Sequence, residues 1–169
     1  MRIRTPILAG VFAVTLAYAA SPYVTLGRLG FAVRNGDAAA LAHMVDWHAV
    51  REGIKEDICD LALDEPNEGT GLRPFGASFV RGIASSAIDR AVTAEALVAV
   101  AGAPAEPGIG TDVAVDWAFF AGPAAFDVSL RVPGQDDPVR LLLALRHGRW
   151  QVQRVWLPDA LLRGANART

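Results

Sequence analysis

The chain has 169 residues, of which 52% are hydrophobic and 20% charged, and a formal net charge of −2. A charge so close to zero excludes the strong positive field with which a protein gathers nucleic acid or an anionic lipid surface. The single cysteine, Cys59, excludes an intramolecular disulfide and a zinc site made of several cysteines. After an N-terminal leader, about 150 residues remain, which is enough for one domain with a sizeable core.

The first 20 residues have the pattern of an export signal or of a short membrane anchor. Arg2 and Arg4 precede an uncharged, mostly apolar run at residues 5–20, which ends in the small-x-small sequence Ala17-Tyr18-Ala19. Basic residues stay on the inner side of a membrane, so this pattern predicts that the rest of the chain lies outside the cytoplasm. The predicted location is the cell envelope, on the periplasmic side of an inner membrane.

Two interpretations of the leader differ in what happens after Ala19. The run at 5–20 is shorter than the roughly 20 residues that span a bilayer comfortably, which favours cleavage. Pro22, Tyr23 and Val24 can extend the run, and Tyr23 suits the headgroup region, which favours a retained anchor. The sequence leaves both open, and with them membrane anchoring through residues 5–20.

The helical half of the domain, residues 21–101, has apolar residues at intervals of three and four. Asp37, Asp46 and Thr93 precede three of these segments as helix N-caps, and Asn35-Gly36 ends the first one as a turn. The expected helices are residues 23–34, 38–44, 47–63, 75–91 and 94–100. An acidic loop is expected at 64–72 and a connector at 102–110.

The strand half, residues 113–157, changes to a period of two. Its alternation predicts four strands, 113–120, 126–132, 139–146 and 150–157, and it slips at Gln153-Arg154, which indicates a β-bulge. The connections 121–124, 133–138 and 147–148 are short enough for hairpins, so the sheet is expected to be an antiparallel meander.

Helices followed by such a sheet predict an α+β fold, with N-terminal helices packed on a four-stranded sheet in one domain, residues 21–169. By analogy, a cone-like sheet of the nuclear-transport-factor-2 or cystatin kind fits this order.

Several segments of the chain are distinctive: Ser21-Pro22-Tyr23-Val24-Thr25-Leu26, Asn35-Gly36-Asp37-Ala38-Ala39-Ala40-Leu41, and Val45-Asp46-Trp47-His48-Ala49-Val50-Arg51-Glu52-Gly53-Ile54-Lys55. With Val92-Thr93-Ala94-Glu95-Ala96-Leu97 and Leu145-Arg146-His147-Gly148-Arg149-Trp150, they resemble an uncharacterised bacterial family, domain of unknown function 2939. The resemblance covers most of the chain after the leader and is strongest between Ser21 and Leu63. It implies an envelope location and a short helical start, and it assigns no activity and no functional residue.

Aromatic residues are the candidates for a binding site. The two-residue period predicts that Trp117, Phe119, Phe126 and Trp150 line one face of the sheet, with Trp47 reaching them from a helix. Core packing accounts for such a cluster, and in a cone-like fold the same face also holds an apolar pocket for a small ligand. These five residues are the predicted ligand pocket.

Asp46, His48 and Asp116 are the candidate acid–base residues. His43, Asp46, His48 and Glu52 form the densest group of metal-ligating residue types, but capping of a helix explains Asp46 and pairing with a base explains Glu52. Asp116 interrupts an otherwise apolar strand. The sequence carries no catalytic signature, and neither a metal nor a cofactor is predicted.

These observations favour a non-enzymatic envelope protein, anchored or released, that binds an apolar small ligand or a partner protein through its aromatic face. One alternative is an enzyme with a small pocket that uses Asp46, His48 or Asp116 for proton transfer. Another is a membrane-anchored structural or scaffold component. A nucleic-acid partner is not predicted.

Overall fold

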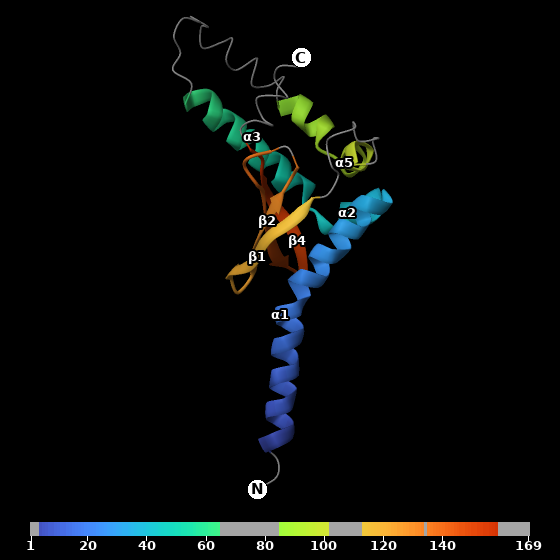
Figure 1. The fold of residues 1–169 in the computed structure, drawn as a ribbon, viewed down its shortest axis with the longest axis vertical. Coiled ribbons are helices and arrows are strands. Elements are labelled where there is room, and N and C mark those ends of the chain that lie inside the picture. Colours follow the sequence, from blue (N-terminus) through green and yellow to red (C-terminus); the bar gives the residue numbers. More distant parts are fainter. Residues whose placement is uncertain (1–3, 65–84, 102–112, 134, 159–169) are drawn as a thin grey trace, which may run out of the picture.

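The computed structural model describes residues 4–64, 85–101, 113–133 and 135–158, with helices first and strands after them (Figure 1). The helices are α1 (Arg4–Asn35), α2 (Ala38–Met44), α3 (Trp47–Asp64), a helical stretch at 85–91, and α5 (Ala94–Ala101). The strands are β1 (Ala114–Gly122), β2 (Ala125–Arg131), β3 (Val139–Arg146) and β4 (Arg149–Trp156). The predicted α+β fold is confirmed. The loop expected at 64–72 (beyond Asp64), the start of the helix expected at 75–91 and the connector at 102–110 lie outside the described residues.

The sheet has the order β1-β2-β3-β4, and each neighbouring pair is antiparallel, which confirms the predicted meander. The bulge expected in the last strand is present as well. The register of the last pair shifts between Leu142 and Leu143, where Gln153 is the extra residue of β4.

A second bulge, which the alternation did not predict, decides which side chains of β1 share a face. Val115 pairs with Leu130 and Trp117 with Ser129, so Asp116 is an extra residue. Because side chains alternate along a strand, Val115 and Trp117 lie on opposite faces of the sheet although they are two residues apart.

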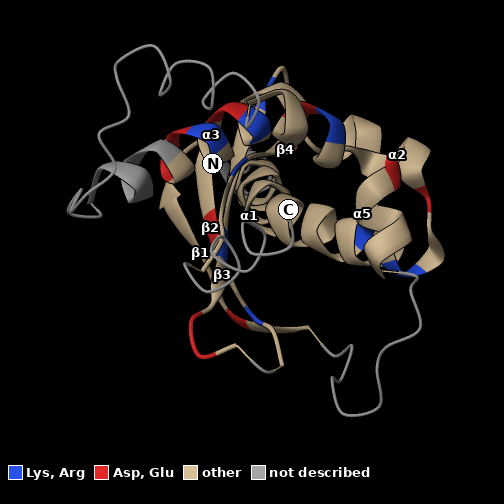
Figure 2. Cartoon of the chain, turned by 90° about the horizontal axis from the view of Figure 1, so that it is seen from above, with Lys and Arg blue, Asp and Glu red and all other residues tan. Residues whose placement is uncertain are grey.

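One face of the sheet carries the main core. Its buried members come from β2, β3, β4, α3 and the segment before α3: Val45, Val50, Ile54, Phe126, Val128, Leu141, Leu143, Trp150 and Val152. Leu26 and Leu29 of α1 pack against this core, and a smaller cluster of Ala32, Leu41 and Ala94 joins α1 to α2 and α5. Figure 2 shows the result from above: α1 lies between the sheet and the pair formed by α2 and α5.

The predicted helix caps are confirmed. At each cap, a side-chain oxygen accepts a hydrogen bond from the backbone N–H group three residues later in the chain. The pairs are Asp37 and Ala40 at 2.9 Å, Asp46 and Ala49 at 3.1 Å, and Thr93 and Ala96 at 3.1 Å. The turn expected at Asn35-Gly36 also forms, with Gly36 at φ +69°. These contacts fix where α2, α3 and α5 begin.

The two edges of the sheet have different neighbours. At β4, the backbone N–H of Asp46 donates to the Val152 carbonyl at 2.9 Å, and Val45 bridges the same residue in parallel. The start of α3 therefore covers that edge. β1 is the other edge strand, and there the hydroxyl of Tyr23 in α1 donates to the carbonyl of Ala118 at 3.1 Å.

α1 differs from the expectation of a leader followed by a separate helix at 23–34, because it runs unbroken through Pro22. Proline lacks an N–H, so the carbonyl four residues earlier, that of Tyr18, loses its helical donor. The hydroxyl of Ser21 donates to this carbonyl instead, at 2.6 Å. The serine before the proline thus replaces the missing hydrogen bond and allows the helix to continue.

Candidate functional site

α1 consists of two halves with different surroundings. In the first half, large apolar side chains that are 60–71% exposed are spread around the helix: Leu8, Val11, Phe12, Val14 and Leu16. Figure 1 shows this half extending away from the rest of the molecule. By length and composition the helix from Leu8 to Asn35 can cross a membrane, a criterion that a signal sequence near an N-terminus also meets. A helix that is apolar around its surface is suited to hydrocarbon.

The second half of α1 docks on the core face of the sheet through aromatic rings. The ring of Tyr18 lies 5.8 Å from that of Phe120 and 6.3 Å from that of Trp150, between centroids. Tyr23 meets Phe126 edge-on at 4.8 Å, and the three sheet residues contact one another at 5.2–6.3 Å. Aromatic pairs in these arrangements stabilise beyond the area they bury. This cluster packs α1 against one end of the sheet.

A chain of hydrogen bonds runs through the same contact. The indole N–H of Trp150 donates to the hydroxyl oxygen of Ser21 at 2.7 Å, and that hydroxyl donates to the Tyr18 carbonyl at 2.6 Å. Pro22, next in α1, is among the fully buried residues. Ser21 therefore repairs the helix at the proline and binds the helix to β4.

The docked half of α1 begins before Ala19, after which one of the two interpretations of the leader places cleavage. Tyr18 precedes Ala19, whereas Ser21 and Pro22 follow it, and all three belong to the same contact. Cleavage after Ala19 would separate Tyr18 from the hydroxyl that its carbonyl accepts from.

The predicted ligand-pocket residues do not share one face of the sheet. Phe126 and Trp150 lie on the core face, where Phe120, not Phe119, pairs with Phe126. Trp117 and Phe119 stack on each other at 6.1 Å on the opposite face. The expectation of one aromatic face was wrong. Which residues of β1 and β2 share a face depends on the register of their hairpin, and the two-residue period of the sequence does not give that register.

The fifth predicted pocket residue, Trp47, begins α3 and packs against both hydrophobic clusters. Its indole nitrogen is buried and has no hydrogen-bond partner among the described residues. Trp47 therefore links the sheet core to the cluster between α1 and α2, rather than joining Trp117 and Phe119.

The opposite face of the sheet carries alternating indole rings and guanidinium groups. The guanidinium carbon of Arg140 lies 5.9 Å from the ring centroid of Trp117 and 5.4 Å from that of Trp156, and Arg154 lies 5.6 Å from Trp156. Such cation–π contacts stabilise by about 0.5–1 kcal/mol each at exposed sites. The sequence pattern did not single out Trp156, because one of its partners, Arg140, comes from the neighbouring strand β3.

Arg154 also ties this face to α3. It forms ion pairs with Glu56 and Asp57 of that helix. Gly53 makes the approach close: a Cβ atom at this position would lie 2.7 Å from Cδ of Arg154.

The three candidate acid–base residues do not form one group, because Asp46 and His48 lie at the start of α3 and Asp116 lies in β1. Asp46 caps α3, and its second carboxylate oxygen accepts from the side-chain amide of Gln153 at 3.1 Å. Asp116 in β1 forms an exposed ion pair with Arg131 at 2.6 Å. His48 is exposed on α3. The structure does not bring these side chains together.

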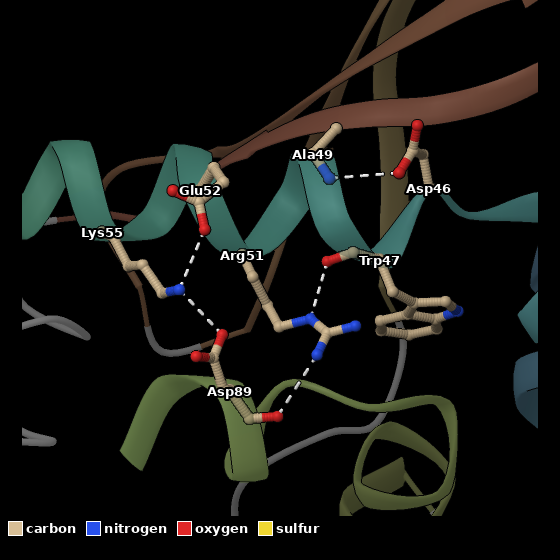
Figure 3. Close-up of polar contacts among 7 residues, drawn as sticks. All are labelled: Asp46, Trp47, Ala49, Arg51, Glu52, Lys55 and Asp89. Carbon is tan, nitrogen blue, oxygen red and sulfur yellow. Dashed lines mark hydrogen bonds and ion pairs between the residues drawn. The ribbon is translucent and has the colours of Figure 1, made fainter. Parts of the chain in front are cut away.

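Figure 3 shows the polar contacts that join α3 to the helical stretch at 85–91. Lys55 pairs with Asp89 at 2.8 Å and with Glu52 at 2.9 Å. The hydrogen bond from Lys55 lowers the pKa of Asp89, and the same bond, with that to Glu52, raises the pKa of Lys55. Arg51 donates to the Trp47 carbonyl at 2.8 Å and to the Asp89 carbonyl at 3.5 Å. These contacts hold two helices together.

Two of the concavities in the described part of the chain lie near residues discussed above. One, of about 550 Å³, lies between α1 and α2 and is lined by Val24, Phe31, Met44 and the side chains of Arg28 and Asp37, among others. The other, of about 230 Å³, is polar and lies beside Asp116 and Arg131. The five predicted pocket residues line neither of them. Among the described residues, no group of three His, Cys, Asp or Glu side chains is placed to hold a metal ion.

No curated protein and no solved structure matches this chain. Residues 11–100 match a family described as "Protein of unknown function (DUF2939)". The match includes the exposed half of α1 from residue 11 onward, its docked half, α2, α3 and most of α5. The chain therefore belongs to the DUF2939 family, as its sequence resemblance indicates.

Proposed function

We propose that the chain is a membrane-anchored protein in which α1 is retained and holds the α+β domain on the periplasmic side of an inner membrane. The observation that carries the proposal is the continuity of α1. One helix both exposes Leu8, Phe12 and Leu16 and docks on the sheet through Tyr18 and Ser21. A leader that is removed has no need of such contacts with the domain.

The length of the uncharged run agrees with a spanning helix. Between Arg4 and Arg28 the sequence has 23 residues without a charged side chain. At about 1.5 Å per residue such a helix measures about 34 Å, against a hydrocarbon core of about 30 Å. The arginines at both ends can extend to the headgroups.

The proposed role of the domain is binding rather than catalysis. Asp46 is engaged as a helix cap and Asp116 in an ion pair, and His48 lies on the surface of α3. A scaffold role, in which the anchor and an interaction surface suffice, is included in the proposal.

A second candidate, binding of an apolar small ligand, is supported by the concavity between α1 and α2. Val24 and Phe31, which line it, are 51% and 65% exposed. Native mass spectrometry of the protein purified from its host membrane tests this candidate. A mass excess that disappears on denaturation supports it, and a mass equal to that of the chain alone contradicts it.

The anchor is tested with two matched phenylalanines of α1. Phe12 and Phe31 are 69% and 65% exposed, but Phe12 lies in the proposed span and Phe31 beyond Arg28. Arginine at the centre of a spanning helix costs about 2.5–3.5 kcal/mol on insertion scales. Phe12→Arg is therefore expected to appear in the alkaline-carbonate supernatant, whereas the wild-type chain and Phe31→Arg remain in the membrane pellet.

The intact mass of the pelleted wild-type protein completes the test. The proposal expects a mass that includes residues 1–20. A mass that begins after Ala19, together with release of the wild-type protein by carbonate, would show a cleaved signal and overturn the proposal.

A further inference from the structure

Two turns of the sheet lie at the end from which the exposed half of α1 emerges. One joins β1 to β2 and the other joins β3 to β4. They are adjacent, because the backbone N–H of Leu145 donates to the Ala124 carbonyl at 2.9 Å. Tyr18 contacts Phe120 and Trp150, which flank these two turns. The turn between β2 and β3 lies at the opposite end of the meander.

The composition of the two ends differs. The sequence from Trp117 to Phe126 has no charged residue, and within it Phe119 is 65% exposed and Phe120 37%. At the adjacent turn, the paired residues Arg146 and Arg149 are exposed. At the opposite end, the turn between β2 and β3 carries the exposed residues Asp136 and Asp137.

The length of α1 decides how close this end lies to a bilayer. The 14 residues from Arg4 to Ala17, which precede the docked half, measure about 21 Å as a helix. That is about 9 Å less than a hydrocarbon core of roughly 30 Å. The missing length corresponds to the next six residues, Tyr18 to Tyr23, which are the residues that contact the sheet.

We infer that the sheet tip, defined as residues 119–125, enters the interface of the membrane that α1 spans. This inference rests on the proposed function. The sheet tip lies beside Tyr18, so it reaches the depth of that residue when α1 spans the bilayer. Phe119 and Phe120 contact the acyl boundary, and Arg146 and Arg149 contact lipid phosphate groups. The occupant of this exposed apolar surface is the lipid bilayer.

The side chains around the sheet tip suit that depth. Tyrosine and tryptophan are enriched where hydrocarbon meets headgroups, and Tyr18, Tyr23 and Trp150 surround the contact between α1 and the tip. The hairpin is paired at its turn, with Gly122 opposite Ala125, and the register shifts once more before it, where Ala121 is an extra residue of β1. Tyr23 supplies a donor to the Ala118 carbonyl of the edge strand, which lowers the cost of placing that edge near lipid.

Spin labels at three exposed alanines test the inference. In the full chain, with the single cysteine replaced (Cys59→Ser), the variants Ala13→Cys, Ala121→Cys and Ala114→Cys each receive a nitroxide. These positions lie in the exposed half of α1, at the sheet tip and at the other end of β1, respectively. The proteins are reconstituted in vesicles of phosphatidylethanolamine and phosphatidylglycerol. Relaxation by oxygen, which concentrates in hydrocarbon, is compared with relaxation by a water-soluble nickel chelate.

The inference expects oxygen to dominate at positions 13 and 121 and the nickel chelate to dominate at position 114. If oxygen dominates the relaxation at position 13 and the nickel chelate dominates at positions 121 and 114, the anchor stands and the inference is overturned. Nickel at position 13 would overturn the proposed anchor itself. The two failures are therefore distinguishable in one set of samples.

Hydrogen–deuterium exchange of the wild-type chain supplies a measurement that needs no substitution. On transfer from detergent to nanodiscs of the same lipids, exchange is expected to slow more for amides of the sheet tip than for those at residues 135–138. An equal change at the two ends would contradict lipid contact at the tip.

Discussion

Replacing Ser21 by alanine tests the docking of α1 at its most specific contact. The hydroxyl of Ser21 accepts from the indole N–H of Trp150 at 2.7 Å and donates to the Tyr18 carbonyl at 2.6 Å. Ser21→Ala leaves both groups without these partners. Trp150 is 5% exposed, so its N–H cannot turn to solvent without moving the ring.

The size of the effect follows from these burials. A buried polar group that loses its partner costs about 1–3 kcal/mol. The Tyr18 carbonyl lies on a residue that is 38% exposed, so water can replace its donor and the main loss comes from Trp150. We expect a loss of about 1–3 kcal/mol, or a fall in Tm of about 2–12 °C for a domain of this size.

The assay is thermal unfolding of the full chain in detergent, followed by near-ultraviolet circular dichroism of the tryptophans. Thr15→Ala is the matched control, because Thr15 donates only to the Val11 carbonyl within the exposed half of α1. Its Tm is expected to equal that of the wild type. Equal values of Tm for Ser21→Ala and Thr15→Ala would refute the idea that the Ser21 hydroxyl holds α1 on the sheet.

Two further predictions concern α3. Gly53→Ala places a Cβ 2.7 Å from Cδ of Arg154, whereas a Cβ at Gly30 has nothing within 4 Å. Both substitutions gain about 1 kcal/mol of helix propensity, so urea unfolding is expected to find Gly53→Ala less stable than Gly30→Ala by about 1–3 kcal/mol. Equal stability of the two variants would contradict the close contact between residue 53 and Arg154. Lys55 lowers the pKa of Asp89 from 3.8 in the folded protein, so the ion pair stabilises the fold above pH 3.8 and this stability is lost as the pH falls through the lowered pKa. The pKa of Lys55 is raised from 10.5, so the stability from its charge is complete below pH 10.5 and is lost as the pH rises through the raised pKa. Urea unfolding at a series of pH values should show the stability difference between wild type and Asp89→Asn shrinking at both extremes, and a constant difference would refute the pair.

Much of the fold could be predicted from local patterns. The caps at Asp37, Asp46 and Thr93 are read from single residues before apolar periods, and the structure has each of them. Short connections between alternating stretches predicted the meander. The slip at Gln153 was visible because a bulge moves every later side chain to the other face.

The contents of each face could not be predicted in the same way. Which residue of β1 lies opposite Phe126 depends on the hairpin register and on the bulge at Asp116, and neither follows from a period of two. The sequence does contain a signal for the contact between α1 and the sheet, but that signal also fits a cleaved leader. Ser21 before Pro22, in an uncharged run that continues to Gly27, is compatible with one continuous helix as well as with a cleavage site.

The continuity of α1 also has a mechanical consequence. A domain on a flexible linker samples many heights and tilts above a membrane, whereas this domain is joined to the proposed anchor by a helix without a break. Each residue inserted into the exposed half of α1 would move the domain by about 1.5 Å along the helix axis and rotate it by about 100° around that axis. In the proposed anchored state, the number of residues before Tyr18 therefore sets which face of the domain is presented to other components of the membrane. The unbroken helix would hold the domain at one height and in one orientation.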